Sequence, residues 1–262
     1  MKQIASRDNP FLKQLRRLLS SAAARREAGQ TVLDGPHLVE AYLGSMNYGP
    51  ADIAVSRSGM ERPEILALVD RAESQRVCVV EDAVFKSLSP SDTPSGIVAL
   101  IPIPRASVVP NGNCLLLEGI QDPGNLGSML RTARAAGFSQ IHLSPGCTDA
   151  WSPKCLRGGM GAHFGLCIGE GADLGDVLRE FPGTSIACDP RADHSVFDLP
   201  LPPPLAVVVG AEGAGLSAEL LSATTQRCRI PMRGETESLN AGVAAAIVMY
   251  EHVRQRTHCL SK

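Results

Sequence analysis

The segment "RCRIPMRGETESLNAGVAAAIVMYE", residues 227–251, decides how the second half of this 262-residue chain is interpreted. From 239 to 250 every residue is small or apolar except Asn240. Apolar residues on all sides of a helix are typical of a protein interior, and a buried amide must satisfy its hydrogen bonds. The pattern predicts a buried helix over 238–256, capped by Ser238, with Asn240 in its first turn. Asn240 is then either a satisfied structural residue or one that orients a ligand or a reacting group.

A glycine-rich stretch precedes this segment, "LAVVVGAEGAGLS" at residues 205–217. We expect a buried strand over 205–209 that runs directly into Gly210, Glu212 and Gly213. Glycine allows close backbone approach, and a carboxylate at the mouth of a buried strand is costly unless it is paired or functional. The alternative is a glycine-rich turn with a helix-capping glutamate.

A third stretch, "LLLEGIQDPGNLGSMLRTARAAGF" at residues 115–138, predicts a strand, a turn and a helix that carries Arg131 and Arg134. In an open α/β sheet, ligands bind beyond the carboxyl ends of the strands. Arg131 lies about one turn into this helix and can therefore face such a crevice. The alternative is an ordinary connection with surface arginines, which is the better interpretation of Arg134.

Strands and helices alternate along the whole chain, which indicates an α/β protein. Strands are predicted at 30–33, 51–55, 76–80, 96–101, 114–118, 139–143, 165–168, 184–188 and 205–209. Helices are predicted at 36–44, 62–72 and 81–88, with others between the later strands. The later strands are expected to form an open, mostly parallel sheet covered on both faces. The proline-rich stretch between the two sets of strands reads as a linker, so we expect domains at 1–101 and 113–262 joined by 102–112.

The first thirty residues carry seven basic and two acidic side chains, although the net charge of the chain is -2. Asn9 and Pro10 predict the start of a helix, and Gly29 predicts its end. Arg16, Arg17, Arg25 and Arg26 are either a solvated face or a surface that contacts RNA phosphates.

Bulk composition indicates a globular protein, with 44% hydrophobic and 20% charged residues. The eight cysteines form no C-x-x-C pair, which favours reduced, buried thiols in a cytoplasmic protein. No signal segment and no apolar run of membrane-spanning length is visible, so we expect no membrane partner. We also expect no metal.

Taken together and in this order, the stretches resemble the three motifs of the SpoU (TrmH-like) branch of the SPOUT RNA methyltransferases. The resemblance rests on "DPGNLGSMLRTARAAGF", "VVVGAEGAGLS" and "IPMRGETESLNAGVAAAIVMYE", with "SPKCLRGGMGAHF" between the first two. It implies a C-terminal domain with a deep trefoil knot and an N-terminal RNA-binding domain like ribosomal protein L30. It also implies a homodimer that uses S-adenosyl-L-methionine to methylate a ribose 2′-hydroxyl in rRNA or tRNA.

The resemblance also assigns residues. The catalytic set would be Asn125, Arg131, Glu212, Ser238 and Asn240. The cofactor would contact Gly210, Glu212, Gly213, Ile230, Met232, Ser238 and Leu239. Two other functions stay open at this point, a non-catalytic RNA-binding or ribosome-assembly factor that retains the fold, and a SPOUT enzyme that methylates a base nitrogen.

Overall fold

The structure is a computed structural model that describes residues 1–45, 49–88, 94–104, 112–234 and 238–259. The chain forms two compact units. Unit 1 contains Met1–Pro104 and Trp151–Phe164, and unit 2 contains Arg105–Ala150 and Gly165–Lys262. Most of the predicted linker lies outside the described residues, so the domain boundaries at 101 and 113 stay a prediction.

The sheet of unit 1 has the order β1-β4-β3-β5-β2. Its strands are β1 (Lys2–Ile4), β2 (Gln30–Asp34), β3 (Asp52–Ser56), β4 (Val77–Val80) and β5 (Ile97–Pro102). β5 runs antiparallel to both of its neighbours, whereas β1, β4 and β3 are parallel. The sequence did not predict β1, because a strand of three residues shows no periodicity.

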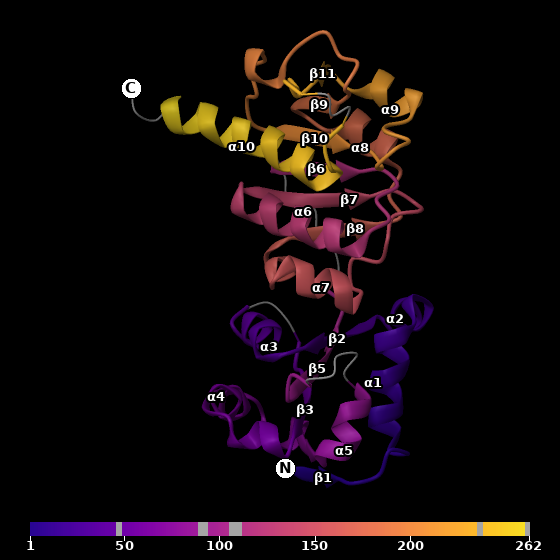
Figure 1. The fold of residues 1–262 in the computed structure, drawn as a ribbon, viewed down its shortest axis with the longest axis vertical. Helices are drawn as coiled ribbons and strands as arrows, with labels where there is room; N and C mark the ends of the chain where they lie inside the picture. The colour runs from indigo at the N-terminus through magenta and orange to yellow at the C-terminus, as the bar shows by residue number, and fades with distance from the viewer. Residues whose placement is uncertain (46–48, 89–93, 105–111, 235–237, 260–262) are drawn as a thin grey trace. The chain divides into compact units, whose positions relative to one another are not determined.

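Helices lie on both sides of this sheet (Figure 1). They are α1 (Pro10–Ser20), α2 (Ala22–Ala28), α3 (Pro36–Leu43), α4 (Pro63–Arg71) and α5 (Asp82–Phe85), with short 3₁₀ turns at Ser58–Glu61, Ser74–Arg76 and Lys86–Leu88. The leucines of α1 at helical spacing, Leu12, Leu15 and Leu18, pack with Phe85 in one buried cluster. α3 and α4 pack against each other on the opposite side.

The basic N-terminal segment forms two helices where the sequence predicted one. Ser21 is extended and its hydroxyl accepts a hydrogen bond from the Ala24 backbone N–H, so it caps a second helix. Gly29, with φ +60°, ends that helix as predicted. Arg25 is only 4% exposed and its guanidinium donates to the Leu18 carbonyl, so the hypothesis that Arg25 contacts phosphates is wrong.

The segment Trp151–Phe164, which carries α7 (Pro153–Gly159), is anchored within unit 1. The Thr31 hydroxyl donates to the Trp151 carbonyl at 2.7 Å, and the ring of Phe164 meets Tyr42 edge-on. These contacts join it to β2 and α3.

The sheet of unit 2 has the order β11-β9-β10-β6-β7-β8, and each neighbouring pair is parallel. Its strands are β6 (Asn113–Leu117), β7 (Phe138–Leu143), β8 (Cys167–Glu170), β9 (Thr184–Cys188), β10 (Leu205–Val209) and β11 (Gln226–Cys228). β10 is buried along its whole length, in agreement with its apolar sequence. β11 was not predicted, because "QRC" is short and polar.

Helices cover both faces of this sheet, as predicted (Figure 1). They are α6 (Pro123–Ala135), α8 (Leu174–Glu180), α9 (Ala218–Ala223) and α10 (Ala241–Cys259), with a 3₁₀ turn at Val196–Asp198. A further 3₁₀ turn, Ala162–Gly165, lies where the chain passes from unit 1 to unit 2. α8 and α9 share a buried cluster with β6, β9 and β10, whereas α10 packs on α6 and β10. None of the helices in the described ranges is long and apolar enough to cross a bilayer.

The last helix differs from its prediction in two respects. It begins at Ala241, so Asn240 rather than Ser238 is the capping residue. Its apolar surface is also not fully buried, since Val243 is 48% and Tyr250 50% exposed. A sequence that is apolar all round therefore has one face against the sheet and another on the surface of the chain.

Candidate functional site

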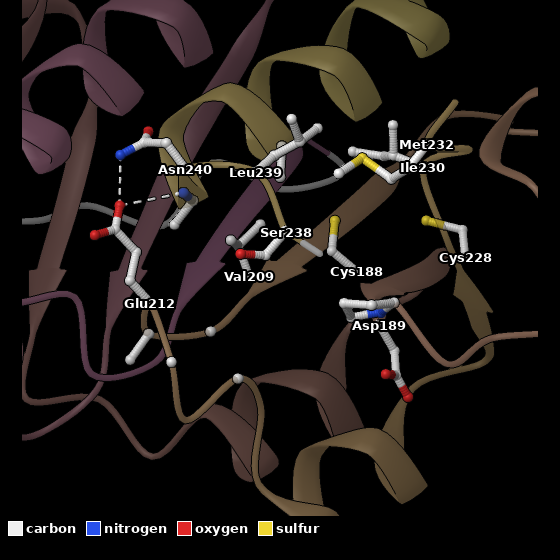
Figure 2. A pocket seen from close by; sticks show the side chains of 17 residues that line it. Cys188, Asp189, Val209, Glu212, Cys228, Ile230, Met232, Ser238, Leu239 and Asn240 are labelled. Carbon is white, nitrogen blue, oxygen red and sulfur yellow. Dashed lines mark hydrogen bonds between the residues drawn. The ribbon is translucent and has the colours of Figure 1, made fainter. Parts of the chain in front are cut away.

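A cavity of about 630 Å³ opens at the carboxyl ends of β9, β10 and β11 (Figure 2). Its wall comes from the turn after each of these strands and from the residues that lead into α10. Lining residues include Cys188, Asp189, Val209, Gly210, Glu212, Gly213, Cys228, Ile230, Met232, Ser238, Leu239 and Asn240. The position agrees with the expectation that ligands bind beyond the carboxyl ends of parallel strands.

The turn after β10 requires glycine at its first position. A Cβ on Gly210 would lie 2.2 Å from the Gly215 carbonyl oxygen, because the chain folds back on itself there. The Gly215 N–H donates to the Ala211 carbonyl at 2.9 Å and closes the turn. Gly213, with φ +92°, adopts a conformation that L-residues avoid. The turn thereby places Glu212 at the edge of the cavity.

Glu212 joins the three sequence stretches at one carboxylate oxygen. Its Oε1 accepts hydrogen bonds from Asn125 Nδ2 at 2.8 Å, Asn240 Nδ2 at 2.5 Å and the Ala241 N–H at 3.3 Å. Figure 2 shows the Glu212 and Asn240 side chains directed toward one another beside the cavity. The carboxylate is therefore hydrogen-bonded at the edge of the cavity and, through the Ala241 N–H, also contacts the start of α10.

Asn240 satisfies its amide at both ends. Its Nδ2 donates to Glu212, and its Oδ1 accepts from the N–H groups of Gly242 and Val243 at 2.9 and 3.3 Å. This is the geometry of a helix N-cap. A Cβ on Gly242 would lie 3.1 Å from Asn240 Oδ1 and 3.2 Å from Ser128 Oγ, so α10 and α6 approach closely here.

The structure gathers most, but not all, of the predicted site residues. All seven residues assigned to the cofactor line the cavity, and so do the catalytic candidates Glu212, Ser238 and Asn240. Asn125 lies outside this lining and reaches it through Glu212. Arg131 is exposed on α6 and is not among the lining residues, and its side chain makes no hydrogen bond or ion pair with another described residue.

Sequence reasoning missed three lining residues at the ends of β9 and β11, namely Cys188, Asp189 and Cys228. Asp189, 7% exposed, follows β9 directly and accepts a hydrogen bond from the Arg191 N–H at 3.0 Å. Cys188 and Cys228 are the last residues of β9 and β11. Cys188 and Asp189 could have been found from the sequence. Strand 184–188 was predicted, and ligands bind beyond the carboxyl ends of strands in an open α/β sheet.

The two cysteines of this wall are register partners on neighbouring strands. The neighbouring Cys228 thiol and burial together raise the pKa of the Cys188 thiol well above its ordinary value. The Cys188 side chain is therefore a neutral thiol at neutral pH.

A parallel sheet with a cavity at its strand ends, walled by a glycine turn and a helix N-terminus, defines a class of α/β protein that binds a small organic molecule at that place. Comparison with known families makes the class specific. The chain belongs to the SpoU rRNA methylase family, whose model matches residues 112–250. Residues 9–99 match the MRM3-like substrate binding domain. The family predicted from the three motifs is thus confirmed.

Individual relatives match nearly the whole chain. An uncharacterized tRNA/rRNA methyltransferase of Synechocystis is 34% identical over 262 residues, which cover 97% of this chain and 94% of the relative. The 23S rRNA (guanosine(2553)-2′-O)-methyltransferase RlmP of Bacillus subtilis is 31% identical over 257 residues, covering 97% and 100%. The solved structure of an AdoMet-bound rRNA methyltransferase from Sinorhizobium meliloti is 26% identical, with a TM-score of 0.82 and coverage of 97% and 98%.

Proposed function

We propose that this protein transfers a methyl group from S-adenosyl-L-methionine to a ribose 2′-hydroxyl of RNA, with ribosomal RNA the favoured substrate and transfer RNA the other. The observation that carries the proposal is the convergence of three family motifs on Glu212 at the mouth of a ligand-sized cavity. Among the relatives, RlmP is named for this reaction on 23S rRNA.

The residues of the cavity fit the cofactor. Its volume, about 630 Å³, lies in the range of about 300–1,000 Å³ typical of small-molecule sites. Val209, Ile230 and Leu239 offer apolar contact to a flat base, and the peptide groups of the turns offer hydrogen bonds to its polar edge. The carboxylates of Asp189 and Glu212 suit a ligand that carries positive charge. The cofactor, when bound, supplies a methyl group on a sulfonium sulfur.

The chain's contribution is mainly to hold groups in place. Glu212 fixes the start of α10 through Asn240 and the start of α6 through Asn125. Both helix N-termini thereby keep one orientation toward the cavity, and accurate alignment of reactants can lower a barrier by about 7–11 kcal/mol. The same contacts also hold Ser238 and Leu239 in place at the cavity, because these residues lead directly into the capped helix.

Arg131 is assigned to the incoming RNA. A guanidinium is effectively always protonated, so it acts as a charge and a fork of donors rather than as a base. Its exposure and its lack of a partner among the described residues leave it available to the ribose oxygen and to a neighbouring phosphate. In this proposal Arg131 stabilises negative charge that develops on the 2′-oxygen, and the proton leaves to phosphate, water or Glu212.

Unit 1 is assigned to RNA backbone. Its N-terminal helices present the exposed basic side chains of Lys13, Arg17 and Arg26. Of the other two predicted arginines, Arg16 donates to Ser87 Oγ and the Arg7 carbonyl, and Arg25 donates to the Leu18 carbonyl. Basic groups on one surface attract phosphates without reading sequence, and selectivity then comes from RNA shape and unpaired bases. We also propose that this unit is an RNA-binding domain like ribosomal protein L30 and that it is joined to the methyltransferase domain by a linker at 102–112.

Three further features of the proposal come from the family. A deep trefoil knot is supported by the path of the chain, which leaves central β10, reaches edge strand β11 and returns to α10 on α6. A homodimer is supported by the exposed Val243 and Tyr250 on α10, which begins at the cavity. A cytoplasmic location is supported by the bacterial relatives from Synechocystis and Bacillus subtilis that match nearly the whole chain.

The decisive experiment maps 2′-O-methylation by resistance to alkaline cleavage in total RNA from cells with and without the gene. The expected result is one or a few ribosomal positions that become cleavable when the gene is absent and resistant again when it is restored. Calorimetric titration with S-adenosyl-L-methionine distinguishes the enzyme from a non-catalytic RNA-binding or ribosome-assembly factor, because the latter predicts no cofactor binding. Loss of a methyl group from a base nitrogen, with every 2′-position unchanged, would overturn the proposed reaction.

A further inference from the structure

Cys188 and Cys228 are placed for cross-linking by the sheet itself. They close β9 and β11 and are direct partners in the parallel register. Neighbouring strands are about 4.8 Å apart, and disulfide-bonded cysteines have Cα atoms about 4.4–6.8 Å apart. Partners in register also project from the same face of a sheet. No other two cysteines in the described part of the chain are register partners.

Both side chains belong to the cavity wall. Figure 2 shows them side by side below Ile230 and Met232. Cys188 is partly exposed toward the cavity, whereas Cys228 is buried. A small oxidant that enters the cavity therefore meets two neighbouring thiols.

We propose that Cys188 and Cys228 form a reversible disulfide in the wall of the cavity, and that this modification lowers the affinity of the cavity for its cofactor. The oxidant is a peroxide. One thiol, through the small fraction present as thiolate, is oxidised by hydrogen peroxide to a sulfenic acid with release of one water, and the second sulfur attacks it, forms the S–S bond and releases a second water. Two thiols and one peroxide thus give one disulfide and two waters.

The effect on the cofactor follows from the residues next to the cysteines. A disulfide brings the two sulfurs to about 2.05 Å from each other. Asp189 directly follows Cys188, and Ile230 lies two residues after Cys228, and both line the cavity. Turning the two side chains toward each other to form this bond changes the wall of the cavity beside these lining groups. This part of the inference rests on the proposed function, whereas formation of the disulfide does not.

The test uses the full-length protein, reduced or treated with hydrogen peroxide, followed by alkylation, peptide mapping and calorimetric titration with S-adenosyl-L-methionine. The expected result is a Cys188–Cys228 cross-linked peptide, affinity at least tenfold weaker than in the reduced protein, and recovery with dithiothreitol. Each variant is compared with its own reduced form. Cys188→Ser and Cys228→Ser should show no change on oxidation. Cys167→Ser, on β8 at the far end of the strand order, should keep the tenfold effect.

The coupling between cofactor binding and oxidation of the cysteine pair gives a second measurement. If oxidation weakens cofactor binding tenfold, saturating cofactor must raise the midpoint potential of the cysteine pair by about 30 mV in a dithiothreitol redox buffer. Absence of the cross-linked peptide, or a cross-link with unchanged affinity and midpoint, overturns the inference. A reduced protein that does not bind S-adenosyl-L-methionine would instead count against the proposed function, and the peptide map would still decide whether the disulfide forms.

Discussion

Glu212 Oε1 lies 2.5 Å from Asn240 Nδ2, although the two residues are 28 positions apart in the chain. The same oxygen accepts Asn125 Nδ2 at 2.8 Å from a residue 87 positions away. One carboxylate oxygen therefore holds the turn after β10, the start of α6 and the start of α10 together. A change at this junction should therefore affect the turn and the starts of both helices together.

Replacing Glu212 by glutamine should weaken the junction without changing its size. The amide cannot provide the charge that strengthens these hydrogen bonds, and bonds to charged groups contribute about 1.5–3 kcal/mol. Because Glu212 is exposed, we expect the lower end, about 1.5 kcal/mol, which corresponds to roughly tenfold weaker cofactor binding. Calorimetric titration with S-adenosyl-L-methionine measures it. Glu219→Gln, on the exposed start of α9, is the matched control, and equal affinities in both variants would contradict the role of Glu212.

Asn240→Asp separates the cap from the junction. The aspartate keeps an oxygen for the N–H groups of Gly242 and Val243, but it loses the Nδ2 donor and places a second carboxylate beside Glu212. We expect a free energy of unfolding lower by about 1–2 kcal/mol, compared with a smaller loss in Asn240→Ser, which also keeps a cap. Denaturant unfolding followed by circular dichroism gives the values.

The double variant Asn240→Asp with Glu212→Gln makes this prediction sharper. The glutamine amide can donate to the aspartate, so the two changes should compensate, with a coupling free energy of at least about 1 kcal/mol. Strict additivity of the two single variants would show that the side chains do not interact.

Gly210→Ala tests the turn after β10. Its Cβ would lie 2.2 Å from a backbone oxygen, that of Gly215, so the turn itself must move. We expect a loss of stability of about 1–3 kcal/mol and at least tenfold weaker binding of S-adenosyl-L-methionine. Gly169→Ala on β8 is the control, because its nearest neighbour, His142 Nδ1, is at an ordinary 3.5 Å. Wild-type melting temperature and affinity in Gly210→Ala would disprove the close approach.

Much of unit 2 could be predicted from the sequence, because buried parallel strands are continuous apolar runs. The expected strands 184–188 and 205–209 match β9 and β10 at both ends. β1 and β11 were missed because three residues carry no periodicity. The knot that the family resemblance implies would leave no trace in periodicity, since a chain crossing changes neither hydrophobic pattern nor turn chemistry.

The errors at the site have local causes. Ser238 fits the pattern of a helix cap, but Asn240 fits it equally, and only the hydrogen bonds to Gly242 and Val243 decide between them. Arg25 looked like one member of a basic surface, yet its guanidinium is drawn inward by the carbonyl of Leu18. Cys228 could not be assigned to the cavity without knowing that β11 lies beside β9. Which strands pair and which distant side chains meet cannot be read from a single sequence.

Arg131 is the residue whose role is most separable from cofactor binding. It is exposed on α6 and does not line the cavity, so Arg131→Lys and Arg131→Ala should leave the affinity for S-adenosyl-L-methionine within about twofold. If its guanidinium stabilises charge on the 2′-oxygen, both variants should lower kcat by about 10²–10³-fold, the cost of removing one such donor. Single-turnover methyl transfer to the mapped RNA target provides the rate. Arg179→Lys, an exposed arginine on the opposite face in α8, should match the wild type. Near-full turnover by Arg131→Lys would show that a point charge suffices and that the planar fork of arginine is not required.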